Sequence, residues 1–329
     1  MSKTRNKKLL LCYVTGLMLA ATAAADEPRE WLQRMNQALV SRNYDGVFSH
    51  WQDGRVEMLR IIHRIEDDEV TERLVSLDGS GREFIRSGSE LACYLPDQRT
   101  VVVEQRNEDR PLLGNFPSFD ETSAGVYQVR ELKRTRFNRR NTRVISVTPS
   151  DEFRYGYRIW IDESTAMPLK TQLCDRQGRV IEQVVFASLT ITSRIPDAAF
   201  KPDVATDGFQ WLRNGHEPRA ASSSQPVMWN AIKLPPGFRM TSRSAQLMPG
   251  ATNPVAHLVF TDGLASVSVF VETKPSAPVP KNPNSGATRL GSSSAFSTVI
   301  DGHKVTAMGE VPPATVRFIA NSLKAAPDR

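Results

Sequence analysis

Hydrophobic residues alternate with polar or small ones along much of this chain, most clearly between residues 153 and 186. One face of the first part of this segment is aromatic or aliphatic and consists of Tyr155, Tyr157, Ile159 and Ile161. A period of two predicts a β-strand with one buried face. Turn-forming residues separate this strand from two further apolar runs, at 169–174 and 180–186, so the segment predicts three consecutive strands.

The same alternation predicts a series of short strands nearer the N-terminus. They cover residues 45–51, 57–65, 71–77, 82–86, 90–95 and 99–104. A helix is predicted before them, over 28–41, because apolar residues recur there at helical spacing. Residues 111–127 are less regular and are expected to form a loop or a short helix, with strands resuming from Arg143. One helix and many antiparallel strands indicate a strongly curved sheet with helical cover.

The composition changes at residues 214–226, which are polar, small and proline-containing. This is the chemistry of a linker. We therefore expect a first domain over 26–213 and a smaller second domain over 227–329. The fold class predicted for the whole chain is α+β, mainly antiparallel β, with the larger curved sheet in the first domain.

Within the second domain, two Asp-Gly pairs at 262–263 and 301–302 predict hairpin turns between apolar strands. A helix predicted over 312–324 closes the domain, with its proline pair in the first turn, where proline is tolerated. The proline- and serine-rich stretch 274–289 is flanked by recognisable strands. It is therefore interpreted as a long loop inside this small α+β domain.

The first 25 residues have the pattern of a secretory signal. Several lysines and arginines precede an apolar run over 9–20, and three alanines end at Ala25. The alternative is an uncleaved membrane anchor, but the apolar run is too short to span a bilayer comfortably. We expect cleavage near Ala25 and an exported protein.

Cleavage changes the charge of the protein. The full chain has 42 lysines and arginines against 36 acidic residues, and four of the basic residues leave with the signal. The mature chain keeps 38 basic residues against 36 acidic ones, a net charge of +2. This balance gives no general reason to expect nucleic-acid binding.

Two cysteines, Cys93 and Cys174, remain in the mature chain. An oxidising compartment permits a disulfide between them, and the alternative is two small buried hydrophobic residues. The sequence leaves these alternatives open. A zinc site needs further cysteine or histidine ligands at close spacing, and none are near, so no metal is expected.

No catalytic constellation is recognisable. The five histidines are scattered, and no serine lies in a strand–turn–helix elbow. Pairs of carboxylates occur only in turns such as Asp162-Glu163, where solvent keeps their pKa values from being pushed apart. We expect that the protein is not an enzyme and that it holds no cofactor.

A basic cluster lies between residues 130 and 143. Its seven cations are Arg130, Lys133, Arg134, Arg136, Arg139, Arg140 and Arg143, against the single acid Glu131. Such a run is either a solvated face or a docking surface for phosphates or acidic peptides, which the arginine fork binds well. The candidate residues for anion docking are Arg134, Arg136, Arg139 and Arg140.

Several longer motifs occur in a fixed order along the chain. They are REWLQRMNQAL at 29–39, CYLPDQRTVVVE at 93–104, ELKRTRFNRRNTRVISVTPSDEF at 131–153, RYGYRIWID at 154–162, MPLKTQLCDRQGRVIEQ at 167–183, LPPGF at 234–238 and GEVPPATVRFIANSLK at 309–324. This ordered set resembles the RseB/MucB family, the periplasmic regulators of the envelope-stress sigma factor. The resemblance implies a LolA-like fold for the first domain, an unclosed β-barrel around an apolar cavity.

The resemblance also implies a partner and a role. The partner would be the periplasmic region of a single-pass inner-membrane anti-sigma factor of the RseA/MucA type. The protein would shield this partner from regulated proteolysis, and a lipid, a lipopolysaccharide or a mislocalised lipoprotein would release it. Tyr155, Tyr157, Ile159 and Ile161 would then line the lipid cavity, although their alternation fits an ordinary core equally well.

A second hypothesis is a periplasmic carrier of lipids or lipoproteins, because the LolA-like fold is shared with such carriers. The presence of a second domain argues against this interpretation, since a simple carrier needs only the cavity. The residues leave the identity of the ligand, the partner contacts and the oligomeric state, including a homo-oligomer, open.

Overall fold

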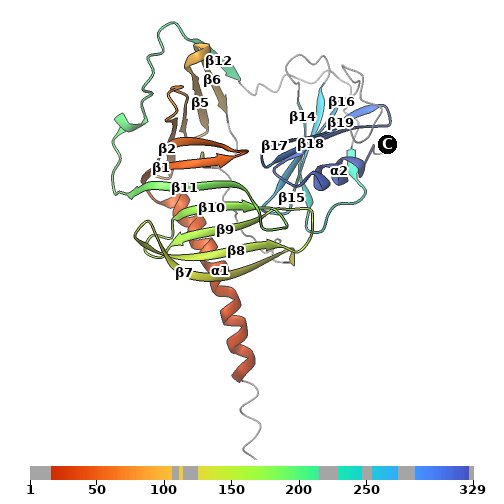
Figure 1. Ribbon diagram of the computed structural model, residues 1–329. Helices are drawn as coiled ribbons and strands as arrows, with labels where there is room; N and C mark the ends of the chain where they lie inside the picture. Colours follow the sequence, from red (N-terminus) through yellow and green to blue (C-terminus); the bar gives the residue numbers. More distant parts are fainter. Residues whose placement is uncertain are drawn as a thin grey trace, which may run out of the picture.

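The computed structural model describes residues 16–105, 111–113, 125–214, 229–246, 254–272 and 286–325, with side chains from Glu27 onward. Two sheets, each with its own hydrophobic core, lie side by side along the chain (Figure 1). No helix among the described residues is long and apolar enough to cross a bilayer.

The first domain is built on one sheet of twelve strands. They are β1 (Tyr44–Gln52), β2 (Arg55–Glu66), β3 (Glu69–Ser76), β4 (Glu83–Ser87), β5 (Glu90–Leu95), β6 (Thr100–Gln105), β7 (Tyr127–Phe137), β8 (Arg140–Pro149), β9 (Gly156–Asp162), β10 (Pro168–Cys174), β11 (Val180–Ile191) and β12 (Gln210–Asn214). Their order in the sheet is β12-β6-β5-β4-β3-β2-β1-β11-β10-β9-β8-β7. All neighbours are antiparallel except β12 and β6. The edge strands β7 and β12 do not pair, so the sheet curves without closing.

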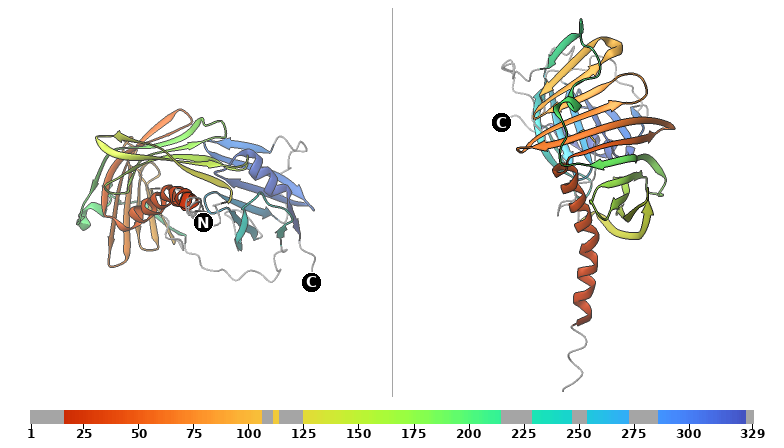
Figure 2. Two further views of the ribbon diagram at one scale, coloured as in Figure 1. Left: turned by 90° about the horizontal axis from the view of Figure 1, so that it is seen from below. Right: turned by 90° about the vertical axis from the view of Figure 1, so that its left-hand side faces the viewer.

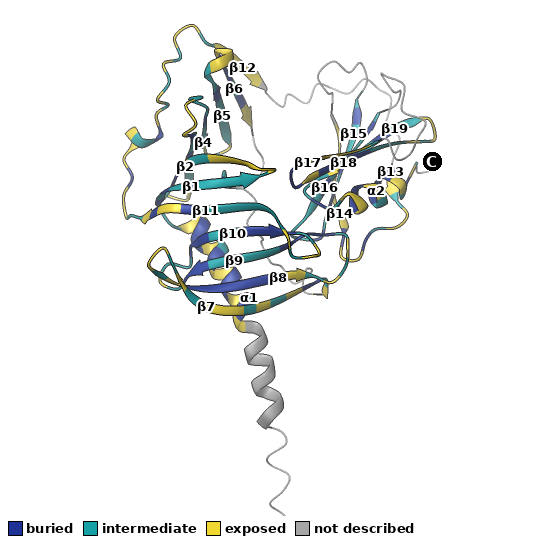
Figure 3. Ribbon diagram, viewed as in Figure 1, coloured by how far each residue is buried: buried dark blue, intermediate teal, exposed yellow. Residues whose placement is uncertain are grey.

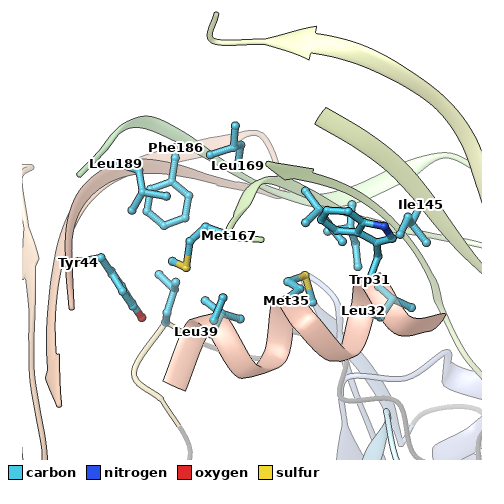
Figure 4. Packing of buried hydrophobic residues seen from close by; sticks show 14 of the residues in the cluster. Trp31, Leu32, Met35, Leu39, Tyr44, Ile145, Met167, Leu169, Phe186 and Leu189 are labelled. Atoms are coloured by element: carbon cyan, nitrogen blue, oxygen red, sulfur yellow. The ribbon is translucent and has the colours of Figure 1, made fainter. Parts of the chain in front are cut away.

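The C-terminal part of helix α1 (Gly16–Ser41) lies in the hollow of the curved sheet, and its N-terminal part projects away from the sheet (Figure 2). Its buried residues Trp31, Leu32, Met35 and Leu39 pack with apolar residues of the strands in one cluster (Figure 4). The strand side of this cluster includes Ile145, Ile159, Ile161, Leu169 and Phe186. The helical spacing places the apolar residues of α1 on one side of the helix, and the alternation places those of the strands on one face of the sheet. These two apolar surfaces face each other across the hollow.

The second domain is a six-stranded antiparallel sheet covered by one helix. Its elements are β13 (Trp229–Ala231), β14 (Arg239–Gln246), β15 (Val255–Thr261), β16 (Ser266–Glu272), β17 (Ala287–Leu290), β18 (Ser293–Ile300), β19 (His303–Gly309), α2 (Pro313–Asn321) and β20 (Leu323–Ala325). The strand order is β14-β15-β16-β19-β18-β17, and β13 pairs separately with β20. Val316 and Ile319 of α2 are fully buried in the same cluster as Phe296 and Val267. This gives the domain a core of its own.

The predicted architecture is confirmed: a curved, unclosed antiparallel sheet with a covering helix precedes a smaller α+β domain. The hairpins at Asp262-Gly263 and Asp301-Gly302 are also confirmed. The predicted linker 214–226 lies outside the described residues apart from Asn214, and so does most of the predicted loop 274–289.

The prediction that strands resume only from Arg143 was wrong. Strand β7 already begins at Tyr127, and β8 begins at Arg140. Strand β7 is an edge strand with mostly exposed side chains, whereas β8 is buried over most of its length (Figure 3). Because an exposed edge strand tolerates charges on both faces, the cations of β7 obscured its alternation. A register shift between Glu131 and Lys133 interrupts it further.

The two cysteines of the mature chain are free. Cys93 lies in β5 and Cys174 in β10, and five strands of the sheet separate these two. A disulfide between them is therefore geometrically impossible in this fold. Burial raises the pKa of both thiols, which keeps them protonated and poorly reactive.

Candidate functional site

A cavity of about 250 Å³ opens on the concave face of the first sheet. Its apolar wall comes from β1, β2, β3, β10 and β11 and from the short described segment at 111–113. The side chains of this wall are Phe48, Leu59, Leu74, Leu112, Leu113, Leu173 and Val184. His50, Glu182 and Glu310 form a polar end, and Glu310 belongs to the second domain. An apolar pocket with a few converging polar groups is the usual form of a small-molecule site.

The four residues predicted to line a lipid cavity are separated by the structure. Tyr157 lies in the cavity wall. Ile159 and Ile161 are fully buried in the core against α1. Tyr155 precedes β9 and is buried beside the second domain, within range of the charges of Arg289 and Glu310. The shared face of the strand is thus core at one end, cavity wall in the middle and domain contact at the other end.

A chain of hydrogen bonds crosses from the polar end of the cavity into the second domain. Nε2 of His50 lies 2.9 Å from Oε1 of Glu182. The side-chain amide of Gln52 donates to Oε2 of Glu182 and to Oγ of Ser292, both at 2.9 Å. The hydroxyl of Ser292 donates to Oε1 of Glu310 at 2.7 Å. Two carboxylates, one from each domain, therefore share one small polar cluster.

The pairing of His50 with Glu182 shifts the pKa of both groups. The hydrogen bond to Glu182 raises the pKa of His50, although burial opposes this effect. Burial raises the pKa of Glu182, but hydrogen bonds with His50, Ser292 and Glu310 outweigh it and hold the pKa below its usual value. Both shifts favour the charged forms, a histidinium and a carboxylate.

A second contact between the domains is centred on Arg154 and Asp262, whose side chains are both fully buried. Nη1 of Arg154 donates to Oδ2 of Asp262 at 2.7 Å. Nε and Nη2 of Arg154 donate to the two carboxylate oxygens of Asp151, each at 3.0 Å. The hydroxyl of Tyr127 donates to Oδ2 of Asp262 at 3.0 Å. Arg154 also donates to the carbonyl of Pro236. This guanidinium thus ties three segments together with charge-assisted hydrogen bonds.

Aromatic rings enclose the same guanidinium. Its centre lies 5.3 Å from the ring of Tyr127 and 5.2 Å from the ring of Phe238. Burial raises the pKa of the Tyr127 phenol well above its usual value, so this group stays a hydrogen-bond donor. Gly237 has a φ of +78°, and a Cβ there would lie 3.1 Å from Val126. The LPPGF motif at 234–238 therefore passes directly over Arg154.

Helix α2 supplies a third contact between the domains. The hydroxyl of Thr315 donates to the carbonyl of Phe153 at 2.6 Å. The rings of Phe153 and Phe318 meet edge to face, with their centres 5.2 Å apart. Both helix residues belong to the C-terminal motif at 309–324.

The basic cluster does not form one free surface. Arg140 donates to the carboxylate of Asp162 at 2.8 Å and to the carbonyl of Leu189 at 2.7 Å, so it holds the sheet together. Arg134 is exposed and lies 3.1 Å from Glu131 and 3.7 Å from Glu27. Arg136 and Arg139 are exposed at the β7–β8 hairpin, where Arg136 donates to the carbonyl of Arg139. Anion docking by Arg134, Arg136, Arg139 and Arg140 stays a prediction.

Replacing Arg140 with glutamine is expected to destabilise the first domain by about 1–3 kcal/mol, because it leaves the buried carboxylate of Asp162 without its cation. The matched change Arg139→Gln alters an exposed turn residue of the same hairpin and should stay within about 0.5 kcal/mol. Urea unfolding of both variants measures the difference. Equal free energies of unfolding would show that the Arg140–Asp162 pair is not structural.

The residues that join the domains were not predicted from the sequence. Asp262 was recognised only as part of a hairpin turn, and Arg154 lies on the polar side of a predicted strand. A signal was nevertheless present in the motifs: Arg154 opens RYGYRIWID, and Glu310 is the second residue of the C-terminal motif. Among the described residues, no group of three or more histidines, cysteines and acids is arranged to hold a metal ion.

Two family models match this chain one after the other. Residues 27–204 match the model described as the MucB/RseB N-terminal domain. Residues 223–324 match the model described as the MucB/RseB C-terminal domain. The two matches together cover nearly all of the chain after the predicted signal.

Individual proteins are similar along the same length. The chain is 31% identical over 322 residues to the sigma factor AlgU regulatory protein MucB of Pseudomonas aeruginosa, which covers 97% of this chain and 98% of that protein. It is 28% identical over 323 residues to the sigma-E factor regulatory protein RseB of Escherichia coli K12, with coverages of 94% and 95%.

Solved structures agree in fold. A crystal structure of MucB in complex with MucA(peri) matches with a TM-score of 0.70 at 27% identity, over 92% of this chain and 100% of that one. A crystal structure of MucB matches with a TM-score of 0.60 at 26% identity, over 91% and 98%.

Proposed function

The chain belongs to the MucB/RseB family of sigma-factor regulatory proteins, and from this premise we propose that it restrains an envelope-stress sigma factor by binding the periplasmic region of an anti-sigma factor. The observation that carries the proposal is the similarity, over 92% of the chain, to a crystal structure titled MucB in complex with MucA(peri). The partner proposed here is a single-pass inner-membrane protein of the RseA/MucA type.

The regulatory effect requires binding but no catalysis by this protein. A bound protein shields its partner from a protease for as long as the complex lasts, so the dissociation rate sets the protection. We propose that this shielding restrains the sigma factor, because an intact anti-sigma factor keeps it sequestered. The role agrees with the expectation from the sequence that the chain is not an enzyme.

Release of the partner needs a ligand that prefers the free form of the protein. The cavity of the first domain has an apolar wall and reaches the contact between the domains, which makes it the candidate site for an acyl chain. We propose that a lipid or a lipopolysaccharide is the signal. The apolar wall would bind an acyl chain, and the exposed Arg134, Arg136 and Arg139 would bind phosphate groups.

The proposed place of action is the periplasm. The first 25 residues have the charge, apolar run and alanines of a cleavable export signal. A partner with a periplasmic region can be reached only there.

A lipid or lipoprotein carrier is the second candidate function, favoured by the apolar cavity alone. The second domain favours the regulatory role, because it contributes Glu310 to the polar end of the cavity and is joined to the first domain by the fully buried Arg154–Asp262 pair. Affinity purification of the tagged mature protein from a membrane extract distinguishes the two. The regulatory role predicts recovery of a single-pass anti-sigma factor, and recovery of lipoproteins without it would favour the carrier.

A further inference from the structure

A second cavity, of about 460 Å³, lies in the first domain beside the C-terminal end of α1. Its apolar wall is formed by Val40 of α1, Ile65 of β2, Val70 of β3 and Pro111. None of these residues lines the cavity of the candidate functional site. The second cavity therefore has a wall of its own, and its volume is sufficient for a short aliphatic chain.

Nε2 of His63, in the wall of this cavity, lacks a hydrogen-bond donor. The side chain of His63 is only 1% exposed and lines the cavity. Its Nδ1 lies 2.9 Å from the carbonyl oxygen of Arg42, and because a carbonyl only accepts, Nδ1 carries the hydrogen. Nε2 is therefore an acceptor, and no donor in the described part of the chain reaches it. A carboxylate oxygen of Glu72 lies 3.9 Å from Nε2, beyond hydrogen-bond length.

The imidazole of His63 is neutral at pH 7 and is held in place by its neighbours. Its ring stacks on the ring of Tyr44, with the centroids 4.8 Å apart and the planes 1° from parallel. Burial, together with the nearby charge of Arg86, lowers the pKa of His63 to about 4. The guanidinium of Arg86 donates to Glu72 and to the carbonyl of Gly88. The lone pair on Nε2 is thus a fixed acceptor, and a buried acceptor without a donor is unfavourable.

Three carboxylates lie at the mouth of the cavity. Asp67 and Asp68 form the turn between β2 and β3, and Glu69 begins β3. All three are exposed and line the cavity, and no cation in the described part of the chain pairs with them. Arg86 also lines the cavity, but it is buried and pairs with Glu72. The charge at the mouth is therefore negative and attracts a cation.

We propose that this cavity binds a small aliphatic amine, whose ammonium group donates to Nε2 of His63 and whose chain lies against the apolar wall. An ammonium group matches both polar features of the site, because it is a cation and has only donors. An alcohol would supply a donor without the charge, and a quaternary ammonium would supply the charge without a donor. The site goes beyond the proposed function, since it differs from the acyl-chain cavity in its residues and in its ligand.

The probe is n-pentylamine, which is protonated at pH 7.5. Nitrogen NMR of histidine-labelled protein follows Nε2 of His63, with the resonances assigned by single substitutions of the other four histidines. We expect this resonance to move toward its hydrogen-bonded value with a Kd of about 1 mM, within the range open to so small a ligand. Pentan-1-ol and pentyltrimethylammonium should each bind at least about tenfold more weakly, because each lacks one of the two features.

Two matched pairs of substitutions test the carboxylates. Asp67→Asn with Asp68→Asn neutralises the turn at the cavity, and Asp53→Asn with Asp301→Asn neutralises two hairpin turns outside it. All four aspartates have φ between +50° and +63°, which asparagine tolerates equally well, so both pairs should fold. We expect the first pair to raise the Kd of n-pentylamine about fivefold and the second pair to leave it unchanged.

Four results would overturn the proposal. They are no binding of n-pentylamine, binding without a shift of Nε2, equal affinity for pentan-1-ol, and an equal effect of the two substitution pairs. Nα-acetyl-lysine N-methylamide presents the same ammonium group from a peptide. Tighter binding of this compound than of n-pentylamine would assign the site to a lysine side chain and would overturn its assignment to a small amine.

Discussion

Replacing Arg154 with methionine is expected to lower the thermal unfolding midpoint by about 6–12 °C, which corresponds to a loss of about 3 kcal/mol. The guanidinium is fully buried and donates to Asp151, to the carbonyl of Pro236 and to Asp262. Methionine fills much of its volume but leaves the carboxylate of Asp262 buried without a cation. The expected loss is therefore mainly the cost of an unpaired buried charge.

An exposed arginine of the first sheet is the matched control. Arg60 lies 2.6 Å from Asp45, but their side chains are 44% and 36% exposed. Arg60→Met should therefore cost less than about 1 kcal/mol. The double change Arg154→Met with Asp262→Leu should recover part of the loss, because it removes the unpaired charge. Equal midpoints for Arg154→Met and Arg60→Met would mean that the buried Arg154–Asp262 pair does not stabilise the protein.

A chain that ends at residue 213 is expected to lose most of its affinity for the anti-sigma partner, with the Kd rising by about 100-fold or more, the scale of a few lost hot-spot contacts. The second domain is fixed against the first by buried contacts, and it is what separates this architecture from a simple lipid cavity. Isothermal titration calorimetry of both chains with the partner's periplasmic region gives the two affinities.

Folding of the shortened chain must be established independently, because truncation exposes Arg154 and Phe153 to water. Circular dichroism and a cooperative thermal transition serve this purpose. A shortened chain that adds Arg154→Met removes the unpaired cation and provides a second version of the same test. Full affinity in a folded fragment would place the partner contact on the first domain.

The strands of the curved sheet could be predicted from the sequence because one of their faces is buried and therefore apolar. Leu189 of β11, which is buried between the exposed polar residues Ser188 and Thr190, is an example. Strand β7 could not be predicted this way, since an edge strand is exposed on more than one side and carries charges throughout. Periodicity thus reports burial, and it fails where the chain forms a strand without burying it.

The candidate site could be predicted only in part for a related reason. Tyr157 was found because it lies on the apolar face of its strand. Asp262 and Glu310 are polar residues near strand ends, and what distinguishes them is a partner more than 100 residues away in the sequence. No local pattern contains such a pairing. The motifs that resemble the RseB/MucB family contained Arg154, Glu310 and Phe238, but the resemblance did not say what these residues do.

The most direct test of the proposed function is protection of the anti-sigma factor itself. The purified periplasmic region of the partner from the same organism is incubated with the protease that degrades it, with and without the mature full-length protein. Binding and shielding predict that the half-life of the partner lengthens as the protein concentration rises. The half-life should level off once the protein concentration is well above the Kd. Tight binding with an unchanged half-life, or no binding at micromolar concentrations, would contradict the proposed function.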